Sequence, residues 1–311
     1  MRKAFVQSLV EAARKDSRIT LLTADLGYAA LEPFIEEFPD RFVNVGVAEQ
    51  NMVALATGMA EAGLVPFCYS IVNFSVLRPY EFIRNGPIVH QLPVRIVGMG
   101  GGLDYSTNGV SHYGIEDVGV LRVQPQIAIY TPGDAAQTRN LVAHTASLPG
   151  PAYYRLGKDD LLEVPGLEGR FTVGRPELVR EGQHVLILAM GGIAAEAVYA
   201  AELLAAKGIA AGVAVVSTLQ PADHTFLANL MRAYPLVVSV EAHYRVGGIG
   251  SLAAEVIAER GLPVRLVRCG LSEIPDGVTG TLPFMYARHG IGRNQLAATA
   301  ERAVRALESA K

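Results

Sequence analysis

Tryptophan is absent from the 311 residues, and cysteine is nearly so, with only Cys68 and Cys269. Two cysteines so far apart in the chain form neither a disulfide framework nor a cysteine-rich metal site. No stretch reaches about 18 uninterrupted apolar residues, which excludes a membrane-spanning helix. The net charge is only −3, so bulk charge favours neither nucleic acid nor an anionic membrane as a partner. These absences predict a soluble protein of a reducing compartment, the cytoplasm.

The composition that remains is that of a folded enzyme-sized chain. Half of the residues are hydrophobic and 18% are charged, which excludes a disordered or low-complexity scaffold. A length of 311 residues suits two α/β domains of ordinary size.

Short apolar runs alternate with helical stretches along the whole chain. The runs predict strands at residues 19–23, 65–70, 94–97, 127–130, 185–189, 211–217, 236–240 and 264–268. Helical periodicity fills residues 50–62, 135–147, 194–207 and 251–260. The strands are almost continuously hydrophobic, as a parallel sheet covered on both faces requires. The pattern therefore predicts an α/β fold with two doubly wound open sheets.

The pattern weakens in the middle of the chain, where residues 148–180 are rich in proline, glycine and charge, which predicts a linker with short strands between two domains. We therefore expect a first domain over residues 1–160, a linker over 161–180 and a second domain over 181–311.

Two segments of the first half place polar or aromatic side chains where strands end. In FVNVGVAEQNM, Glu49 opens a long helix after a glycine-containing turn. After the strand that ends near Ser70, Phe74 stands in a loop or first helical turn, with Tyr69 nearby. An acid in a first helical turn and a buried aromatic are both common without any function. At the carboxyl edge of an α/β sheet, however, an aromatic can stack on a heterocycle.

Two glycine-rich segments follow strands. Gly100–Gly102 lead through a long loop to His112, without the spacing of a dinucleotide site or the lysine of a phosphate loop. Glu116 and Asp117 are expected to cap the next helix. In VEAHYRVGGIGS, the glycines at 247, 248 and 250 predict tight strand-to-helix packing, and Glu241 and His243 could face a domain or subunit interface. The remaining histidines have no metal-site spacing, so we expect no metal ligands in this chain.

These segments, taken in order, resemble transketolase. The matching pieces are ADL at 24–26, GVAEQNM at 46–52, the aromatic segment around Phe74, NGVSH at 108–112, TPGD at 131–134, GPAYYRL at 150–156 and the later VEAHYRVGGIGS. The resemblance runs essentially from end to end, and GxAEQN is its most specific piece. It implies a pyrimidine-binding domain for thiamine diphosphate followed by the transketolase C-terminal domain.

One family motif is missing. Full-length transketolases hold the diphosphate and a divalent metal in an additional N-terminal domain through a GDG…N motif, and this sequence contains no GDG. The resemblance therefore implies the C-terminal subunit of a split transketolase. The ligands of Mg²⁺ or Ca²⁺ would lie on a partner N-terminal subunit, and the chain would form a homodimer within a heterotetramer.

The resemblance also assigns the cofactor contacts. Glu49 would hydrogen-bond ring nitrogen N1′ of the aminopyrimidine, where a buried carboxyl promotes proton removal from the thiazolium ring. Phe74 would stack on the pyrimidine. Tyr69 lies next to this segment, and Asp25 falls on a family acid near the cofactor and the subunit interface.

The substrate positions match the family in part. His112 would contact the donor ketose near its C1 hydroxyl and carbonyl. Asn108 stands where an Asp usually reads a donor hydroxyl, and Lys158 lies near a phosphate-binding Arg of the family. Gly100 and Ala29 replace a histidine and a serine that help to bind the acceptor. We therefore expect a modified acceptor.

The predicted activity is transfer of a two-carbon ketol unit from a ketose to an aldose or aldehyde. One alternative is a beta-type subunit of a 2-oxo acid dehydrogenase, with which NFS at 73–75 is compatible, or a deoxyxylulose-phosphate-synthase-like enzyme. The NGVSH loop favours transketolase over both. A non-catalytic partner subunit is an alternative of another class, against which the intact Glu49, Phe74 and His112 argue.

Overall fold

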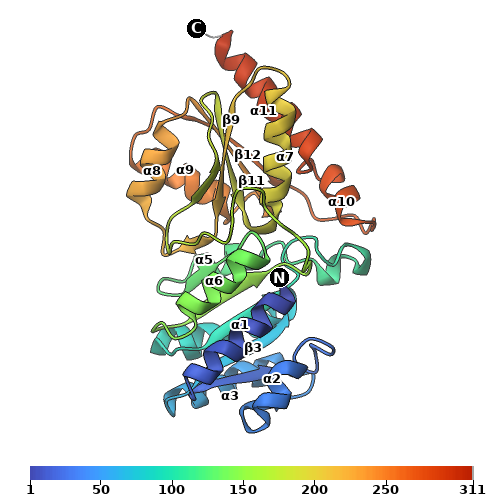
Figure 1. Cartoon of the computed structure of the whole chain (residues 1–311), viewed down its shortest axis with the longest axis vertical. Coiled ribbons are helices and arrows are strands. Elements are labelled where there is room, and N and C mark those ends of the chain that lie inside the picture. The colour runs from blue at the N-terminus through green and yellow to red at the C-terminus, as the bar shows by residue number, and fades with distance from the viewer. Residues whose placement is uncertain (310–311) are drawn as a thin grey trace.

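A computed structural model describes residues 1–309 as two α/β units that lie one above the other along the long axis of the molecule (Figure 1). Each unit is built on one open, mainly parallel sheet covered by helices on both faces. The predicted fold class, two doubly wound α/β sheets, is therefore confirmed.

The first unit contains a seven-stranded sheet in the order β10-β5-β6-β4-β3-β1-β2. Its strands are β1 (Ile19–Thr23), β2 (Phe42–Asn44), β3 (Val65–Ile71), β4 (Arg95–Met99), β5 (Ala128–Tyr130), β6 (Ala152–Leu156) and the distant β10 (Thr218–Gln220). All neighbours pair in parallel except β10, which runs antiparallel to β5. Because the strands run parallel, their carboxyl ends and the loops that follow lie along one edge of the sheet.

Two layers of helices bury this sheet. α1 (Arg2–Lys15), α2 (Glu32–Glu37) and α6 (Ala135–Thr145) pack their apolar residues on one face. α3 (Glu49–Glu61), α4 (Tyr80–Ile83) and α5 (Asp117–Arg122) cover the other. Short helical turns link them: η1 (Pro39–Arg41), η4 (Ser106–Asn108) and η5 (Val110–His112) are 3-10 turns, while η2 (Asn73–Leu77) and η3 (Arg84–Ile88) are π-helical.

The second unit has a five-stranded sheet in the order β12-β11-β8-β9-β7. Its strands are β7 (Glu177–Arg180), β8 (Val185–Met190), β9 (Ala211–Val216), β11 (Leu236–Tyr244) and β12 (Arg265–Leu271). The helices are α7 (Ala194–Ala205), α8 (His224–Arg232), α9 (Ile249–Glu259), α10 (Leu282–Arg288) and α11 (Arg293–Glu308), with the short turn η6 (Gly191–Ile193) before α7. β7 falls within the residues expected to form a linker and pairs antiparallel with β9.

The two units share apolar cores. One cluster joins Met52 and Ile96 of the first unit to Leu188 and Leu252 of the second. β10 adds a second connection, because a segment of the C-terminal half completes the first sheet. The units are therefore packed as one body rather than joined by a bare linker.

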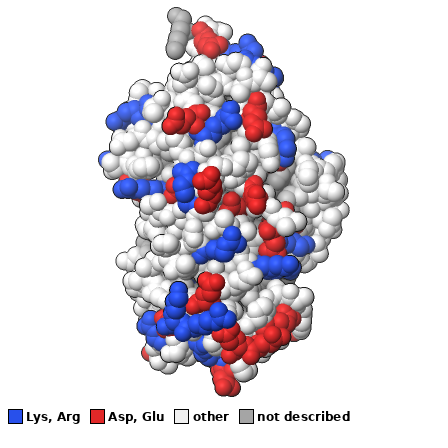
Figure 2. Space-filling model, in the orientation of Figure 1, with Lys and Arg blue, Asp and Glu red and all other residues white. Residues whose placement is uncertain are grey.

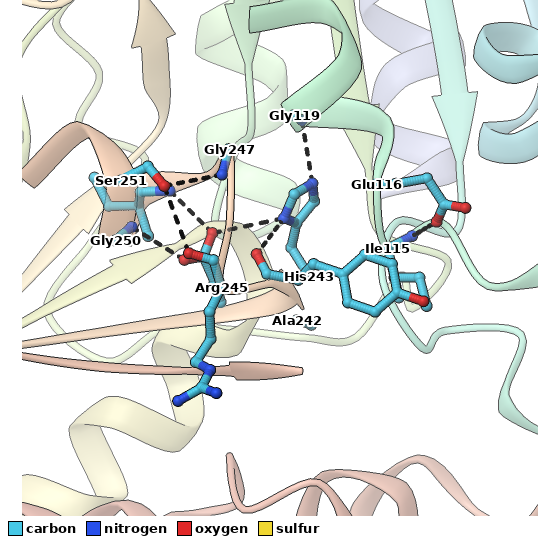
Figure 3. A network of polar contacts seen from close by, with 12 residues as sticks. Ile115, Glu116, Gly119, Ala242, His243, Arg245, Gly247, Gly250 and Ser251 are labelled. Carbon is cyan, nitrogen blue, oxygen red and sulfur yellow. Dashed lines mark hydrogen bonds and ion pairs between the residues drawn. The ribbon is translucent and has the colours of Figure 1, made fainter. Parts of the chain in front are cut away.

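Polar groups also cross this boundary (Figure 3). The amide of Gly119 in α5 donates to Nε2 of His243 in β11, at 3.2 Å. The other ring nitrogen, Nδ1, lies 2.6 Å from the carbonyl oxygen of Tyr244 and therefore carries the proton. Burial lowers the pKa of His243, so this neutral ring is the form that the interface holds. The expectation that Glu241 and His243 could face a domain interface is confirmed for His243.

Asp117 does not cap α5, as the sequence had indicated. It is fully buried and accepts hydrogen bonds from the Tyr153 hydroxyl, at 2.6 Å, and from Nε of Arg155, at 2.8 Å. No side-chain cap is present at this helix. The cap prediction was wrong because β6 supplies a buried hydroxyl and guanidinium that engage the carboxylate instead of the helix amides.

The surface carries both signs of charge. On the face drawn in Figure 2, basic and acidic side chains intermix over both units and form no expanse of one sign. Over residues 1–309, no helix has the length and apolar character needed to cross a membrane.

Candidate active site

The site predicted around Glu49 lies at the carboxyl edge of the first sheet. Glu49 is the first residue of α3, and Gly46, in the turn before it, has a φ of +73° that favours glycine. The side chain is only 4% exposed, and Oε1 accepts a hydrogen bond from Nη1 of Arg78 at 2.9 Å. A buried carboxylate is thus held next to a planar cation at the end of the sheet.

Phe74 and Arg78 come from the helical segment that follows β3. Phe74 lies in the π-helical turn η2, and Arg78 is its C-cap. The guanidinium carbon of Arg78 sits 4.0 Å above the centre of the Phe74 ring, within cation–π range. One guanidinium therefore contacts two of the four predicted cofactor residues, the Glu49 carboxylate and the Phe74 face.

His112 also contacts Phe74. Its ring meets the Phe74 ring edge-on, with centroids 5.4 Å apart, and lies 6.0 Å from the Tyr105 ring. Nδ1 is 3.0 Å from the Ser111 hydroxyl, and the Ser111 carbonyl accepts from Asn73 Nδ2 at 3.1 Å. The predicted loop histidine is thus fixed by contacts to both neighbouring segments.

Lys158 continues the same series of contacts. Its ammonium lies 4.6 Å from the centre of the Tyr105 ring, and its backbone amide donates to Oδ2 of Asp104 at 2.7 Å. We call the residues that touch in this order the contact chain: Glu49, Arg78, Phe74, His112, Tyr105 and Lys158. Four of the six were predicted from the sequence.

Three further predicted residues lie outside the contact chain. Asn108 is exposed on the loop that carries His112, and its backbone amide donates to the backbone carbonyl of Tyr105 at 2.8 Å. Asp25 follows β1, where its carboxylate accepts from the Tyr28 hydroxyl and from Asn44 Nδ2. These hydrogen bonds, the Tyr28 bond first, lower the pKa of Asp25. Tyr69 is buried on β3 with its ring stacked on Phe5, at 6.1 Å, in the core beneath α1.

The sequence interpretation missed Arg78 and Tyr105. Arg78 stands four residues after Phe74, a helical spacing that brings side chains together, so the signal was present in the sequence. Tyr105 has no such signal, because only the folded loop places its ring between His112 and Lys158. Its ring also fills the space that a side chain at Gly100 would need.

The Glu49 end of the contact chain fits a flat, nitrogen-containing heterocycle. The Phe74 face and the Glu49 carboxylate already hold a planar nitrogen cation between them. Beside them, the buried Oδ1 of Asn73 has no hydrogen-bond partner among residues 1–309 and could accept from an amino group. Over the same residues, no group of three or more His, Cys, Asp or Glu side chains is placed to hold a metal ion.

The chain is thus an α/β protein of two units, with a buried carboxylate and an aromatic face at the carboxyl edge of the first sheet. The family models identify it further: the transketolase pyrimidine-binding domain matches residues 1–162, and the transketolase C-terminal domain matches residues 174–296. The chain belongs to the transketolase family.

Relatives of similar length support this assignment. An apulose-4-phosphate transketolase subunit of Actinobacillus succinogenes is 34% identical, over 94% of this chain and 94% of that protein. The 6-deoxy-6-sulfo-D-fructose transketolase subunit SqwH of Clostridium sp. is 36% identical, over 95% of this chain and 92% of that protein. A solved structure described as a split gene transketolase, inactive beta4 tetramer, superposes with a TM-score of 0.89 at 35% identity over 98% of both chains.

Deoxyxylulose-phosphate synthases are also similar. The enzyme of Syntrophotalea carbinolica is 33% identical over 95% of this chain, but the match covers only 46% of that protein. The Actinobacillus and Clostridium relatives, in contrast, match over more than nine-tenths of their own length and are named as transketolase subunits.

Proposed function

We propose that this chain is the C-terminal subunit of a split, thiamine-diphosphate-dependent transketolase. With its partner it would transfer a two-carbon ketol unit from a ketose donor to an aldose or aldehyde acceptor. The observation that carries the proposal is the contact chain itself, because it aligns the Glu49 carboxylate, the Phe74 face and the His112 ring in a family member.

Three residues of the contact chain would have distinct tasks. Bound thiamine diphosphate would supply a thiazolium carbon that acts as the nucleophile. Glu49, buried at the start of α3, would hold ring nitrogen N1′ of the aminopyrimidine by a hydrogen bond. Phe74 would orient the same ring by stacking. His112 engages Ser111 through Nδ1, which leaves Nε2 to reach a hydroxyl or carbonyl of the donor.

The diphosphate and its divalent metal would be held by a partner subunit that carries the N-terminal domain. A relative that aligns over 94% of its own length is named as one subunit of a transketolase, which supports such a partner. The beta4 tetramer of the similar solved chain supports self-association. We therefore propose two copies of this chain and two partner subunits in the active assembly.

The acceptor subsite would differ from that of an ordinary transketolase. The Tyr105 ring fills the space that a side chain at Gly100 would need, and the Lys158 ammonium lies 4.6 Å from the centre of that ring. Two relatives of almost equal identity are named for different sugars, so overall similarity does not select the substrate. A panel of donors and acceptors tests this point. Best turnover with xylulose 5-phosphate and ribose 5-phosphate would contradict a modified acceptor.

The reconstituted complex tests the function. Replacing Glu49 by Gln keeps the shape of the side chain but removes the carboxylate, and we expect turnover to fall by at least about 100-fold. Glu61→Gln, at the exposed end of the same helix, is the matched control and should retain wild-type turnover.

Three outcomes would overturn parts of this assignment. Full activity of the Glu49 variant would favour a non-catalytic partner subunit. Release of CO₂ from pyruvate without ketol transfer would favour the dehydrogenase alternative. Turnover by the purified single chain would contradict the split assembly.

A further inference from the structure

Arg78 makes the two contacts that the proposed function assigns to the aminopyrimidine. Its guanidinium is planar and nitrogen-rich, it covers the Phe74 face at 4.0 Å, and it donates to Oε1 of Glu49 at 2.9 Å. A pyrimidine ring needs the same face and the same carboxylate. The guanidinium and the ring cannot both stack on that side of Phe74 while bound to that oxygen.

We propose that Arg78 is a placeholder, which occupies the pyrimidine position in the cofactor-free chain and has to leave it before thiamine diphosphate binds. This inference rests on the proposed function. It adds a residue that sets the affinity and order of cofactor binding, beyond the residues that would hold the cofactor.

The burial of the two partners explains why a placeholder is useful. Glu49 is 4% exposed, whereas the Arg78 side chain is 48% exposed. Without a partner, the carboxylate would be buried with its charge uncompensated, at a large cost. Arg78 removes that cost in the free chain, and its exposed side allows it to swing into solvent when another ligand takes its place.

The local backbone is also suited to such a movement. Arg78 follows the π-helical turn η2, and its amide reaches the Asn73 carbonyl only at 3.4 Å. Single π-helical turns have weak hydrogen bonds and are frequent at functional sites. Asn73, at the start of the same turn, carries the unpartnered Oδ1, so one short segment presents both the placeholder and a free acceptor.

The test measures binding rather than turnover. The full-length chain is titrated with the fragment 4-amino-5-hydroxymethyl-2-methylpyrimidine by ligand-detected NMR, and with thiamine diphosphate by calorimetry. We expect Arg78→Met to bind the fragment on the order of tenfold more tightly than wild type, because one half-exposed ion pair and one cation–π contact no longer need to be broken. Arg78→Lys should fall between the two, since an ammonium keeps the charge but loses the planar stack.

Arg84→Met is the matched control. Arg84 is an exposed arginine of the neighbouring π-helical turn that bonds Asn85, and its loss should leave fragment affinity unchanged. Circular dichroism verifies that each variant is folded, and Arg78→Gln replaces Arg78→Met if the latter is not. Equal or weaker fragment binding by the folded Arg78 variants overturns the proposal, and absence of detectable binding to any of them counts as equal.

Phe74→Ala separates failure of the placeholder from failure of the function. If fragment binding is lost in Phe74→Ala but is not improved by removing Arg78, the cofactor site stands and the placeholder is wrong. If binding does not depend on Phe74, the proposed cofactor site is itself wrong, and the placeholder is overturned with it.

Discussion

His112 owes its position to neighbours that no motif singles out. The rings of Phe74 and Tyr105 both contact its ring, while Ser111 engages Nδ1. Tyr105 in turn carries the Lys158 cation on its face. Tyr105, which the sequence interpretation did not select, therefore contacts two of the predicted substrate residues, His112 and Lys158.

Replacing Tyr105 should weaken the binding of both substrates. Tyr105→Ala removes the ring that contacts His112, the proposed donor contact, and Lys158, so we expect the KM values for donor and acceptor each to rise about five- to tenfold, the size of one lost aromatic or one lost cation–π contact. Tyr105→Phe keeps the ring and should stay within about threefold of wild type. Steady-state kinetics of the reconstituted complex, with donor and acceptor varied separately, measures both. Equal damage in the two variants would show that the hydroxyl, not the ring, matters.

At this scale the sequence predicted residue types better than their contacts. Glu49, Phe74, His112 and Lys158 lie in one contact chain, and their catalytic and binding roles stay predictions. The ion pair between Arg78 and Glu49 was not predicted, because a long exposed side chain has many conformations and only the fold selects one.

Helix α9 illustrates how an element is stabilised by a buried acid. Glu241, at the end of β11, accepts from the amides of Ile249 and Gly250 at the start of α9, at 2.9 and 3.0 Å. Gly248 is required beside it, because an added Cβ would overlap Oε2. Burial raises the pKa of Glu241 from its ordinary 4.5 to about 7, against these two hydrogen bonds. The predicted packing role of this glycine segment is confirmed.

The raised pKa predicts a pH-dependent stability. Because the folded chain keeps the Glu241 proton to higher pH than the unfolded chain does, its contribution is full below pH 4.5 and is lost as pH rises through about 7. Glu241→Gln removes this titration. As pH rises from 4.5 to 8, the unfolding free energy of the wild type should fall by about 3 kcal/mol relative to that of the variant. Urea unfolding across this range measures it.

Glu259→Gln, on the exposed end of α9, provides the comparison and should follow the wild-type profile. Parallel profiles for wild type and Glu241→Gln would contradict the assignment of a buried, protonated carboxyl.

Element prediction succeeded where the chain alone determines the element. The eight predicted strands match β1, β3, β4, β5, β8, β9, β11 and β12 at their first residue or within one residue of it. β6 and β7 lie within residues 148–180, where short strands were expected without bounds, and AYYRL of β6 contains an arginine whose burial depends on Asp117. The edge strand β10 was missed, because three residues become a strand only through a distant partner.

The whole molecule depends on a close approach between its two units. Gly247 of the second unit has a φ of +90°, and a Cβ placed there would lie 2.6 Å from the Cα of Gly119 in the first. Next to this contact, the Gly119 amide reaches His243. Steric exclusion and a hydrogen bond thus fix the same point of the interface.

Gly247→Ala should therefore destabilise the chain more than strain in φ alone explains. We expect a loss of about 2 to 4 kcal/mol in unfolding free energy, from the positive φ and the backbone clash together. Gly261→Ala is matched for a positive φ, +56°, but meets nothing within 4 Å, and should cost about 1 kcal/mol. Chemical denaturation measures both. Equal losses of unfolding free energy in the two variants would show that the close contact between Gly247 and Gly119 does not constrain the interface.

The expected domain boundaries at residues 160 and 180 stay predictions. Strand β10 affects when the first sheet can be completed during synthesis, because it lies far beyond both boundaries in the sequence. On the ribosome, β5 at the edge of the first sheet has to wait for residues 218–220 before its outer hydrogen bonds are made. At roughly 5 to 20 residues per second, the wait is on the order of 5 to 20 s. During synthesis the first unit would carry an open strand edge, the feature through which nascent chains most readily misassociate. The interval before β10 pairs with β5 is thus the one in which chaperones would most readily meet the open edge of the first sheet.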